Sequence, residues 1–170
     1  VIHEQNRVVG KVNKLFIKGS SEVFYTFEGT KGGQEKKIGM TVGNPVKNFG
    51  FKTLGEKIVF LGGSGGSEEI NELALEFARN NKDEKILLQT GVKRKERIDN
   101  KIEEEGINNI ETIGFSRIED IYKQSKIVIA RSGSTTLSEL IENEIPIITI
   151  PFEQSADNHQ QENAKFIEEM

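Results

Sequence analysis

The chain has 170 residues, of which 35% are hydrophobic and 29% are charged, as is usual for one globular domain or for one domain with a fragment of another. This composition excludes collagen-like, mucin-like and wholly disordered proteins. Because 23 basic and 27 acidic side chains leave a net charge of −4, a nucleic acid is not an expected partner.

No segment has the pattern of a signal peptide or of a membrane-spanning helix. The longest apolar runs, 127–130 and 145–151, are far shorter than the roughly 20 residues that cross a bilayer. The absence of cysteine excludes a disulfide scaffold, a thiol nucleophile and a zinc site built on thiolates. Because the chain begins with Val1 and not with Met, we expect it to be part of a longer protein.

The first 47 residues predict a small segment of mixed structure. We expect a short strand leading into His3-Glu4-Gln5-Asn6, a helix through Val12 to Phe16, strands over 22–27 and 38–42, and a loop over 29–34. The polar stretch 43–55, which contains Pro45 and three glycines, is typical of a connection between domains, and we place the linker at 48–55.

Continuous apolar runs follow the linker, at 57–61, 85–90, 110–113 and 126–130. Runs without polar alternation are typical of parallel strands that are covered on both faces. Helical spacing separates them, most clearly in the stripe formed by Ile70, Leu73, Ala74, Phe77 and Ala78. Alternating strands and helices predict an α/β fold with a Rossmann-like open parallel sheet, whose ligands bind at the carboxyl ends of the strands.

The loop Gly62-Gly63-Ser64-Gly65-Gly66-Ser67 lies between a predicted strand and a predicted helix. Bare backbone there lets an anion approach N–H groups and the positive end of a helix dipole. The loop lacks the Lys-Ser/Thr end of a Walker motif and the third glycine of a Rossmann fingerprint. The alternative is a tight turn in which Ser67 is the helix N-cap and Glu68 and Glu69 satisfy the dipole.

A second loop, Arg131-Ser132-Gly133-Ser134-Thr135-Thr136, occupies the same position in a later strand–helix unit and adds hydroxyl donors. Together the two loops could hold a diphosphate. The alternative is local, because Thr136-Leu137-Ser138-Glu139 has the Ser/Thr-x-x-Glu pattern of a capping box. A third polar feature, the basic run 93–97, alternates with acid on a predicted helix, and we interpret it as a solvated face.

Five short motifs are distributed along essentially the whole chain, and both their residues and their order carry a resemblance to a known family. They are His3-Glu4-Gln5-Asn6; Gly43-Asn44-Pro45-Val46; Gly62-Gly63-Ser64 followed by Gly66; Arg131-Ser132-Gly133 with Thr136 and Ser138-Glu139; and Pro151 with His159-Gln160 and Asn163-Ala164. In this combination they resemble the MurG family of peptidoglycan glycosyltransferases. The resemblance implies a GT-B fold, in which two Rossmann-like domains face each other across a cleft and the carboxyl-terminal one binds a UDP-sugar.

For this chain the resemblance implies a remnant of the acceptor-side domain over 1–47 and a UDP-sugar-binding domain over 56–170. The implied reaction is the inverting transfer of N-acetylglucosamine from UDP-GlcNAc to lipid-linked N-acetylmuramoyl-pentapeptide at the cytoplasmic face of the plasma membrane, where the enzyme is peripheral. No cofactor is implied. The chain has no Asp-x-Asp pair, so transfer that depends on a metal held by that motif is not expected.

The resemblance also implies roles for individual residues in binding the donor. It places Ser64 near the diphosphate, Thr136 at a phosphate, Glu139 at the ribose, Phe115 beside the uracil, Gln160 and Gln161 at the sugar hydroxyls, and Asn6 at the sugar from the other domain. Arg131, Ser134 and Lys47 complete this set. The family usually has arginine at the position of Lys47, and lysine offers a point charge where arginine offers a bidentate fork.

Simpler interpretations remain open for several of these residues. Without the resemblance, Phe115 is more often a core residue than a platform for a base, the two glutamines are typical of a polar helix face, and His159 is consistent with a helix start. An inverting displacement needs a base for the acceptor hydroxyl. The family's amino-terminal Gly-Gly-Thr-Gly-Gly-His loop, which serves the acceptor, is missing, so the catalytic base is unknown and we expect donor binding without turnover. The alternatives are another GT-B enzyme that uses a UDP-sugar, and a nucleotide-sugar-binding module that needs a partner half.

Overall fold

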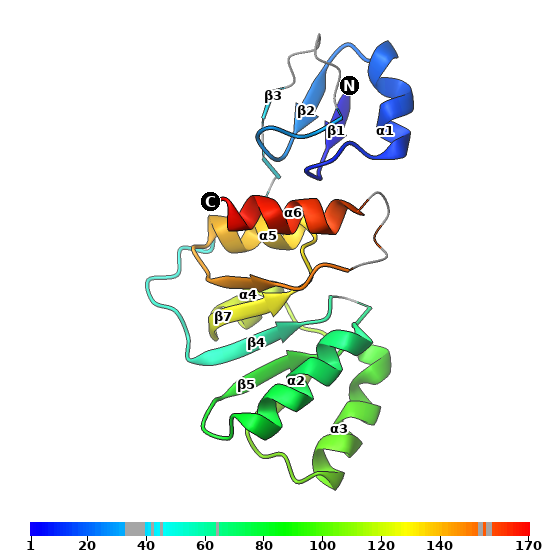
Figure 1. Cartoon of the computed structure of the whole chain (residues 1–170). Coiled ribbons are helices and arrows are strands. Elements are labelled where there is room, and N and C mark those ends of the chain that lie inside the picture. Colours follow the sequence, from blue (N-terminus) through cyan, green and yellow to red (C-terminus); the bar gives the residue numbers. More distant parts are fainter. Residues whose placement is uncertain (33–39, 42, 45, 64, 153–154, 156–157) are drawn as a thin grey trace. The chain divides into compact units, whose positions relative to one another are not determined.

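The structure is a computed structural model that describes residues 1–32, 40–41, 43–44, 46–63, 65–152, 155 and 158–170 (Figure 1). The chain divides into two compact units. Unit 1 comprises 1–47, 132–142 and 150–170, and unit 2 comprises 48–131 and 143–149.

Unit 2 is built on a five-stranded sheet. Its strands are β4 (Lys57–Leu61), β5 (Ile86–Gln89), β6 (Ile110–Ile113), β7 (Ser125–Ala130) and β8 (Ile147–Thr149). The spatial order is β6-β5-β4-β7-β8, and every pair is parallel. The four predicted strands are therefore confirmed as β-structure; β4, β5 and β7 are largely buried, whereas the edge strand β6 is only partly buried.

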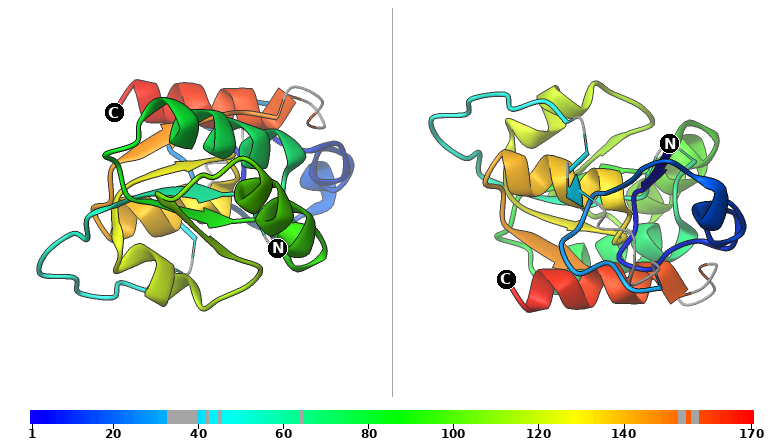
Figure 2. Two further views of the ribbon diagram at one scale, coloured as in Figure 1. Left: turned by 90° about the horizontal axis from the view of Figure 1, so that it is seen from below. Right: turned by 90° about the horizontal axis from the view of Figure 1, so that it is seen from above.

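Helices cover both faces of this sheet. They are α2 (Glu68–Asn80), α3 (Lys95–Glu104), which follows the 3-10 turn η2 (Val92–Arg94), and α4 (Ile118–Tyr122). Both views in Figure 2 show α2 and α4 on opposite faces of the sheet. The predicted stripe of α2 packs inward, with Ile70 and Ala74 fully buried and the centroid of the Phe77 ring 5.7 Å from that of Phe60.

The order of the sheet defines where a ligand can bind. If the five strands are numbered 1 to 5 along the chain, their spatial order is 3-2-1-4-5, so the direction of winding reverses between β4 and β7. Open α/β sheets bind ligands beyond the carboxyl ends of the strands at such a switch point. The glycine-rich loop follows β4 and Arg131 follows β7, so both lie at this position.

Unit 1 has a smaller parallel sheet of β1 (Ile2–Glu4), β2 (Val23–Tyr25) and β3 (Met40–Thr41), with α1 (Lys11–Phe16) and the 3-10 turn η1 (Ile17–Gly19). Its core gathers Val9, Ile17 and Val23. The same unit contains α5 (Ser134–Glu142) and α6 (His159–Glu168), and the Phe166 ring of α6 lies 5.0 Å from that of Phe27.

Differences from the predicted elements are confined to short pieces. The second and third strands are shorter than predicted, and residues 38, 39 and 42 lie outside the described residues. Strand β8 was not predicted. Residues 48–55 form no helix or strand, and Phe49 packs 6.4 Å from the Tyr122 ring while its N–H donates to Asn143 Oδ1 at 2.7 Å.

Candidate functional site

The glycine-rich loop at the switch point needs glycine for its packing. Gly66 has φ +71°, and a Cβ there would lie 2.2 Å from the carbonyl oxygen of Thr90. Gly91, with φ +80°, meets Gly66 from the other side, where a Cβ would lie 2.7 Å from its Cα. Only glycine combines a left-handed backbone with so close an approach. Ser64, the predicted diphosphate contact in this loop, lies outside the described residues.

Ser67 is the N-cap of α2, as the local interpretation predicted. Its Oγ accepts a hydrogen bond from the N–H of Ile70 at 3.4 Å, and its carbonyl accepts from Asn71 at 3.0 Å. The amides of Glu68 and Glu69 in the first turn have no acceptor within the helix, as at any helix start. The cap and an anion site are thus compatible, because they use different N–H groups.

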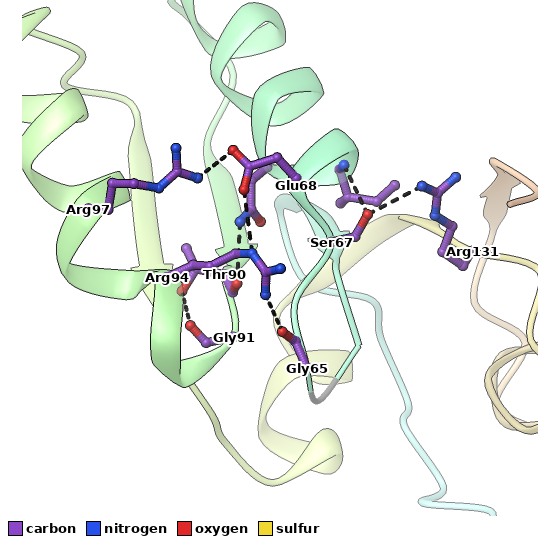
Figure 3. A network of polar contacts seen from close by, with 10 residues as sticks. Gly65, Ser67, Glu68, Thr90, Gly91, Arg94, Arg97 and Arg131 are labelled. Atoms are coloured by element: carbon purple, nitrogen blue, oxygen red, sulfur yellow. Dashed lines mark hydrogen bonds and ion pairs between the residues drawn. The ribbon is translucent and has the colours of Figure 1, made fainter.

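Both glutamates at the start of α2 are paired with arginines, as Figure 3 shows for Glu68. Glu68 accepts a hydrogen bond from Arg97 and forms an ion pair with Arg94 at 3.4 Å. The hydrogen bond from Arg97 is the main cause that lowers the pKa of Glu68. Burial opposes it as the next largest cause, and the charges of both arginines and a hydrogen bond from Arg94 lower the pKa further. Glu69 lies 2.5 Å from an Arg131 nitrogen. Their charges are therefore balanced locally and do not by themselves oppose a phosphate.

Arg131 links the two sides of the switch point within unit 2. Its Nη2 donates to Ser67 Oγ at 3.3 Å (Figure 3) and also to Glu69 Oε2. Its side chain is 17% exposed. A guanidinium held beside a helix start can add charge-assisted hydrogen bonds to a bound phosphate. The structure therefore brings this predicted donor-site residue to the glycine-rich loop.

Phe115 lies directly after β6, and the core interpretation of it is wrong. The side chain is 71% exposed. The preceding Gly114 packs closely against η2, since a Cβ there would lie 3.3 Å from Val92 Cα, and Val92 is itself 68% exposed. An exposed aromatic ring at the carboxyl end of a parallel strand is available for stacking on a base.

The basic run 93–97 is only in part the solvated face that its sequence pattern predicted. Lys93 is exposed, whereas Arg94 Nη1 donates to the carbonyl oxygen of Gly65 at 2.5 Å. Arg94 therefore contacts the glycine-rich loop, which the sequence pattern did not indicate. The local alternation of charge describes the helix surface but carries no information about a loop 29 residues away.

The second predicted phosphate loop leads into α5 in unit 1, and the capping-box interpretation of it is wrong. The helix begins at Ser134, so Thr136 is its third residue and not its N-cap. The Leu137 N–H already donates to Gly133 O at 3.0 Å. Thr136 and Glu139 are half-buried and three residues apart, hence neighbours on one side of the helix.

Gln160 and Gln161, the predicted sugar contacts, lie in the first turn of α6, which begins at His159 as expected from the sequence. Gln160 Oε1 accepts a hydrogen bond from the Phe152 N–H at 2.9 Å, and its backbone oxygen accepts from Ser132 Oγ at 2.6 Å. Gln161 is half-buried. Gln160 thus joins Phe152 and Ser132 within the described residues of unit 1.

A buried asparagine in unit 1 connects three of the sequence motifs. Asn163, 0% exposed, accepts from the Arg7 N–H at 2.9 Å and donates to Ser132 O at 3.0 Å and to Asn6 Oδ1 at 3.2 Å. Asn6 is therefore brought beside the Ser132 loop and α6. Asn163 belongs to one of the five sequence motifs, but the motif alone did not indicate this role.

A buried carboxylate fixes the backbone around Asn6. Glu4, 3% exposed, accepts at Oε1 from the N–H of Asn6 at 3.0 Å and at Oε2 from Gly10 N–H and Asn13 Nδ2, both at 2.8 Å. Glu4 also belongs to a sequence motif that did not indicate this role, although its position at the end of β1 could have done so.

Lys47, the remaining predicted donor contact of this part of the chain, is exposed.

The described ranges hold neither a cluster of metal ligands nor a membrane-spanning helix. Within them, no three His, Asp or Glu side chains lie together as metal ligands would. No helix of that part of the chain is long and apolar enough to cross a bilayer.

Comparison with known proteins agrees with the motifs. The sequence model described as "Glycosyltransferase family 28 C-terminal domain" matches residues 57–170. The UDP-N-acetylglucosamine–N-acetylmuramyl-(pentapeptide) pyrophosphoryl-undecaprenol N-acetylglucosamine transferase of Thermosipho melanesiensis is 38% identical, over 98% of this chain and 48% of that protein. The transferase of the same name from Campylobacter fetus is 37% identical, over 98% of this chain and 49% of that protein.

Among solved structures, MurG of Acinetobacter baumannii matches with a TM-score of 0.78 at 23% identity, over 99% of this chain and 50% of that chain. At this identity the likeness concerns the fold, and it confirms the predicted Rossmann-like α/β class. The chain spans about half the length of the curated relatives it matches.

Proposed function

The chain belongs to glycosyltransferase family 28, and we propose that it supplies the UDP-sugar-binding half of a GT-B transferase. The proposed reaction moves N-acetylglucosamine from UDP-GlcNAc to lipid-linked N-acetylmuramoyl-pentapeptide in peptidoglycan synthesis. The observation that carries this proposal is the 38% identity to a transferase of that name over 98% of the chain. The glycine-rich loop at the switch point of unit 2 supports it independently.

In unit 2 we assign the nucleotide end of the donor to the groups at the carboxyl ends of the strands. Ser64 and Arg131 bind the diphosphate, and Phe115 stacks beside the uracil. The support for Arg131 is its position against Ser67, and for Phe115 its exposed ring. In unit 1 we assign Ser134 and Thr136 to a phosphate, Glu139 to the ribose, and Asn6, Gln160 and Gln161 to the sugar, with Lys47 a further diphosphate contact.

The chemistry follows from the leaving group. UDP departs with negative charge growing on its β-phosphate, and preorganised N–H and hydroxyl donors at helix starts stabilise such charge. We propose an inverting displacement that needs no metal, which the absence of an Asp-x-Asp pair from the sequence supports. The base that removes the acceptor proton is assigned to the part of the relatives that this chain does not span.

We further propose that residues 1–47 belong to the acceptor-side domain, 48–55 to the linker and 56–170 to the donor domain. The relatives' names specify an undecaprenol-linked acceptor, so the whole enzyme must work at a lipid surface, and we propose the cytoplasmic face of the plasma membrane. Support comes from α1, where Val12, Leu15 and Phe16 are exposed beside lysines. Basic apolar helices bind anionic interfaces. Sedimentation with phosphatidylglycerol vesicles should carry down the chain but not its Leu15→Glu variant.

Calorimetric titration of the chain with UDP-GlcNAc, UDP-glucose and UDP tests the central proposal. UDP-GlcNAc and UDP are expected to bind at millimolar concentration, UDP-GlcNAc more tightly than UDP-glucose. Absence of heat and of any rise in melting temperature with all three would contradict it. The alternative, a binding module without transferase function, predicts the same heats. The two differ when the amino-terminal half of a relative is added with acceptor, because only a transferase half then releases UDP.

A further inference from the structure

Arg94 grips the glycine-rich loop through a single peptide group. The carbonyl oxygen of Gly65 accepts a hydrogen bond from Arg94 Nη1 at 2.5 Å (Figure 3). The N–H of the next residue, Gly66, donates to Gly63 O at 3.0 Å. The peptide plane between Gly65 and Gly66 is therefore fixed at both ends, because a peptide group rotates as one rigid unit.

This peptide is one that would otherwise rotate easily. Both of its flanking residues are glycines, which lack the Cβ that restricts φ and ψ elsewhere. A rotation that turned the Gly65 carbonyl toward a bound phosphate would place a partial negative charge against the anion and break the hydrogen bond from the Gly66 N–H to Gly63 O. The orientation that Arg94 enforces keeps that oxygen neutralised by a guanidinium.

Arg94 is itself held in place by short-range geometry. It is the last residue of η2, and its N–H donates to Gly91 O at 3.1 Å. Gly91 packs against Gly66, where a Cβ would lie 2.7 Å from the Gly66 nitrogen. The side chain also forms an ion pair with Glu68 at 3.4 Å, and it is only 35% exposed. The guanidinium thus contacts the loop through Nη1 and faces Glu68, in the first turn of α2, through Nε.

We propose that Arg94 is a positioning residue for nucleotide-diphosphate binding, which holds the Gly65–Gly66 peptide in the orientation that keeps its carbonyl oxygen away from a bound phosphate. The proposal rests on the proposed function and adds a residue that none of the sequence motifs contains. Arg94 acts on the ligand through the loop, so its contribution depends on the fork geometry of arginine and not on net charge alone.

Substitution of Arg94 by methionine tests the proposal, with Lys93→Met as the control that removes the same charge from the neighbouring exposed position. Without the hydrogen bond from Arg94, the loop conformation that binds UDP becomes one of several states. The apparent affinity falls in proportion to the population of that conformation, so UDP should bind Arg94→Met about tenfold more weakly. Lys93→Met should bind as the original chain does. Arg94→Lys, which keeps the charge but loses the fork, should fall between them.

A double variant separates the grip on the loop from simple neutralisation of Glu68. Arg94→Met/Glu68→Gln removes both charges, and UDP affinity should stay low because the Gly65 carbonyl still lacks its hydrogen bond from residue 94. Full recovery in this variant would overturn the proposal. The Gly66 amide should also exchange with solvent faster in Arg94→Met, with β5 amides unchanged, a readout that requires no ligand.

The outcomes distinguish this inference from the function on which it rests. If the original chain binds UDP and Arg94→Met binds it equally well, the inference alone is wrong. If Lys93→Met loses as much affinity as Arg94→Met, only net charge matters and the inference is also wrong. If the original chain binds no UDP, the proposed function fails and the inference fails with it.

Discussion

Alanine substitutions along the glycine-rich loop should have unequal effects on stability, and the structure orders them. Gly66→Ala meets two costs: a left-handed backbone at φ +71° and a Cβ 2.2 Å from Thr90 O. The backbone strain is about 1–2 kcal/mol and overpacking adds about 1–3 kcal/mol, against which a less flexible unfolded chain returns about 0.4–1 kcal/mol. The expected loss in free energy of unfolding is about 2–4 kcal/mol.

Two neighbours supply matched controls. Gly63 has φ +75° but no atom of the described residues within 4 Å of an added Cβ, so its alanine variant carries only the strain and should lose about 1 kcal/mol or less. Gly65 has no left-handed backbone and likewise no close atom in the described part of the chain, and its alanine variant should be neutral or slightly stabilised. Urea unfolding at 25 °C gives the three values. Equal losses at Gly63 and Gly66 would refute the close contact with Thr90 as the reason for glycine.

Three further substitutions test other parts of the account. Glu4→Gln replaces one of two acceptor oxygens by a donor that faces other donors, and urea unfolding should show a loss of about 2–4 kcal/mol. Glu139→Ala should weaken UDP binding about tenfold, a loss of about 1.4 kcal/mol, yet leave unfolding nearly unchanged, because the helix does not use it as a cap; the reverse pattern in calorimetry and unfolding would restore the capping role. Hydrogen bonds from Lys165 and then Lys31 lower the pKa of Glu162 to about 2, below its unfolded value of 4.5. Its stabilisation is therefore present above pH 4.5 and lost as pH falls toward 2, so Glu162→Gln should flatten the stability profile in that window, by less than about 1 kcal/mol because both lysines are exposed.

The sheet of unit 2 was predictable because burial on both faces leaves a direct mark in the sequence. Strands β4, β5 and β7 are runs of large apolar residues, and each coincides with a predicted strand. Strand β8 has only three residues, and Ile148 within it is 50% exposed. A short edge strand with an exposed position carries too little pattern to distinguish it from a loop.

The site was predictable as a set of loops but not as a set of contacts. The Ser67 cap is a local feature and was predicted, whereas the start of α5 was wrong because the helix begins at Ser134 and takes Thr136 into its first turn. The contacts of Arg94 with Gly65 and of Asn163 with Asn6 join residues far apart in the chain. Such pairs arise only when the sheet brings loop ends together, and no local spacing encodes them.

The most direct test of the central claim is nuclear magnetic resonance of the ¹⁵N-labelled chain during titration with UDP. The amides of Gly63, Gly65 and Gly66 and of the first turn of α2 should shift in a saturable way, together with the ring protons of Phe115. Shifts confined to other parts of the chain, with these amides unmoved at saturation, would contradict a diphosphate site at the carboxyl end of β4.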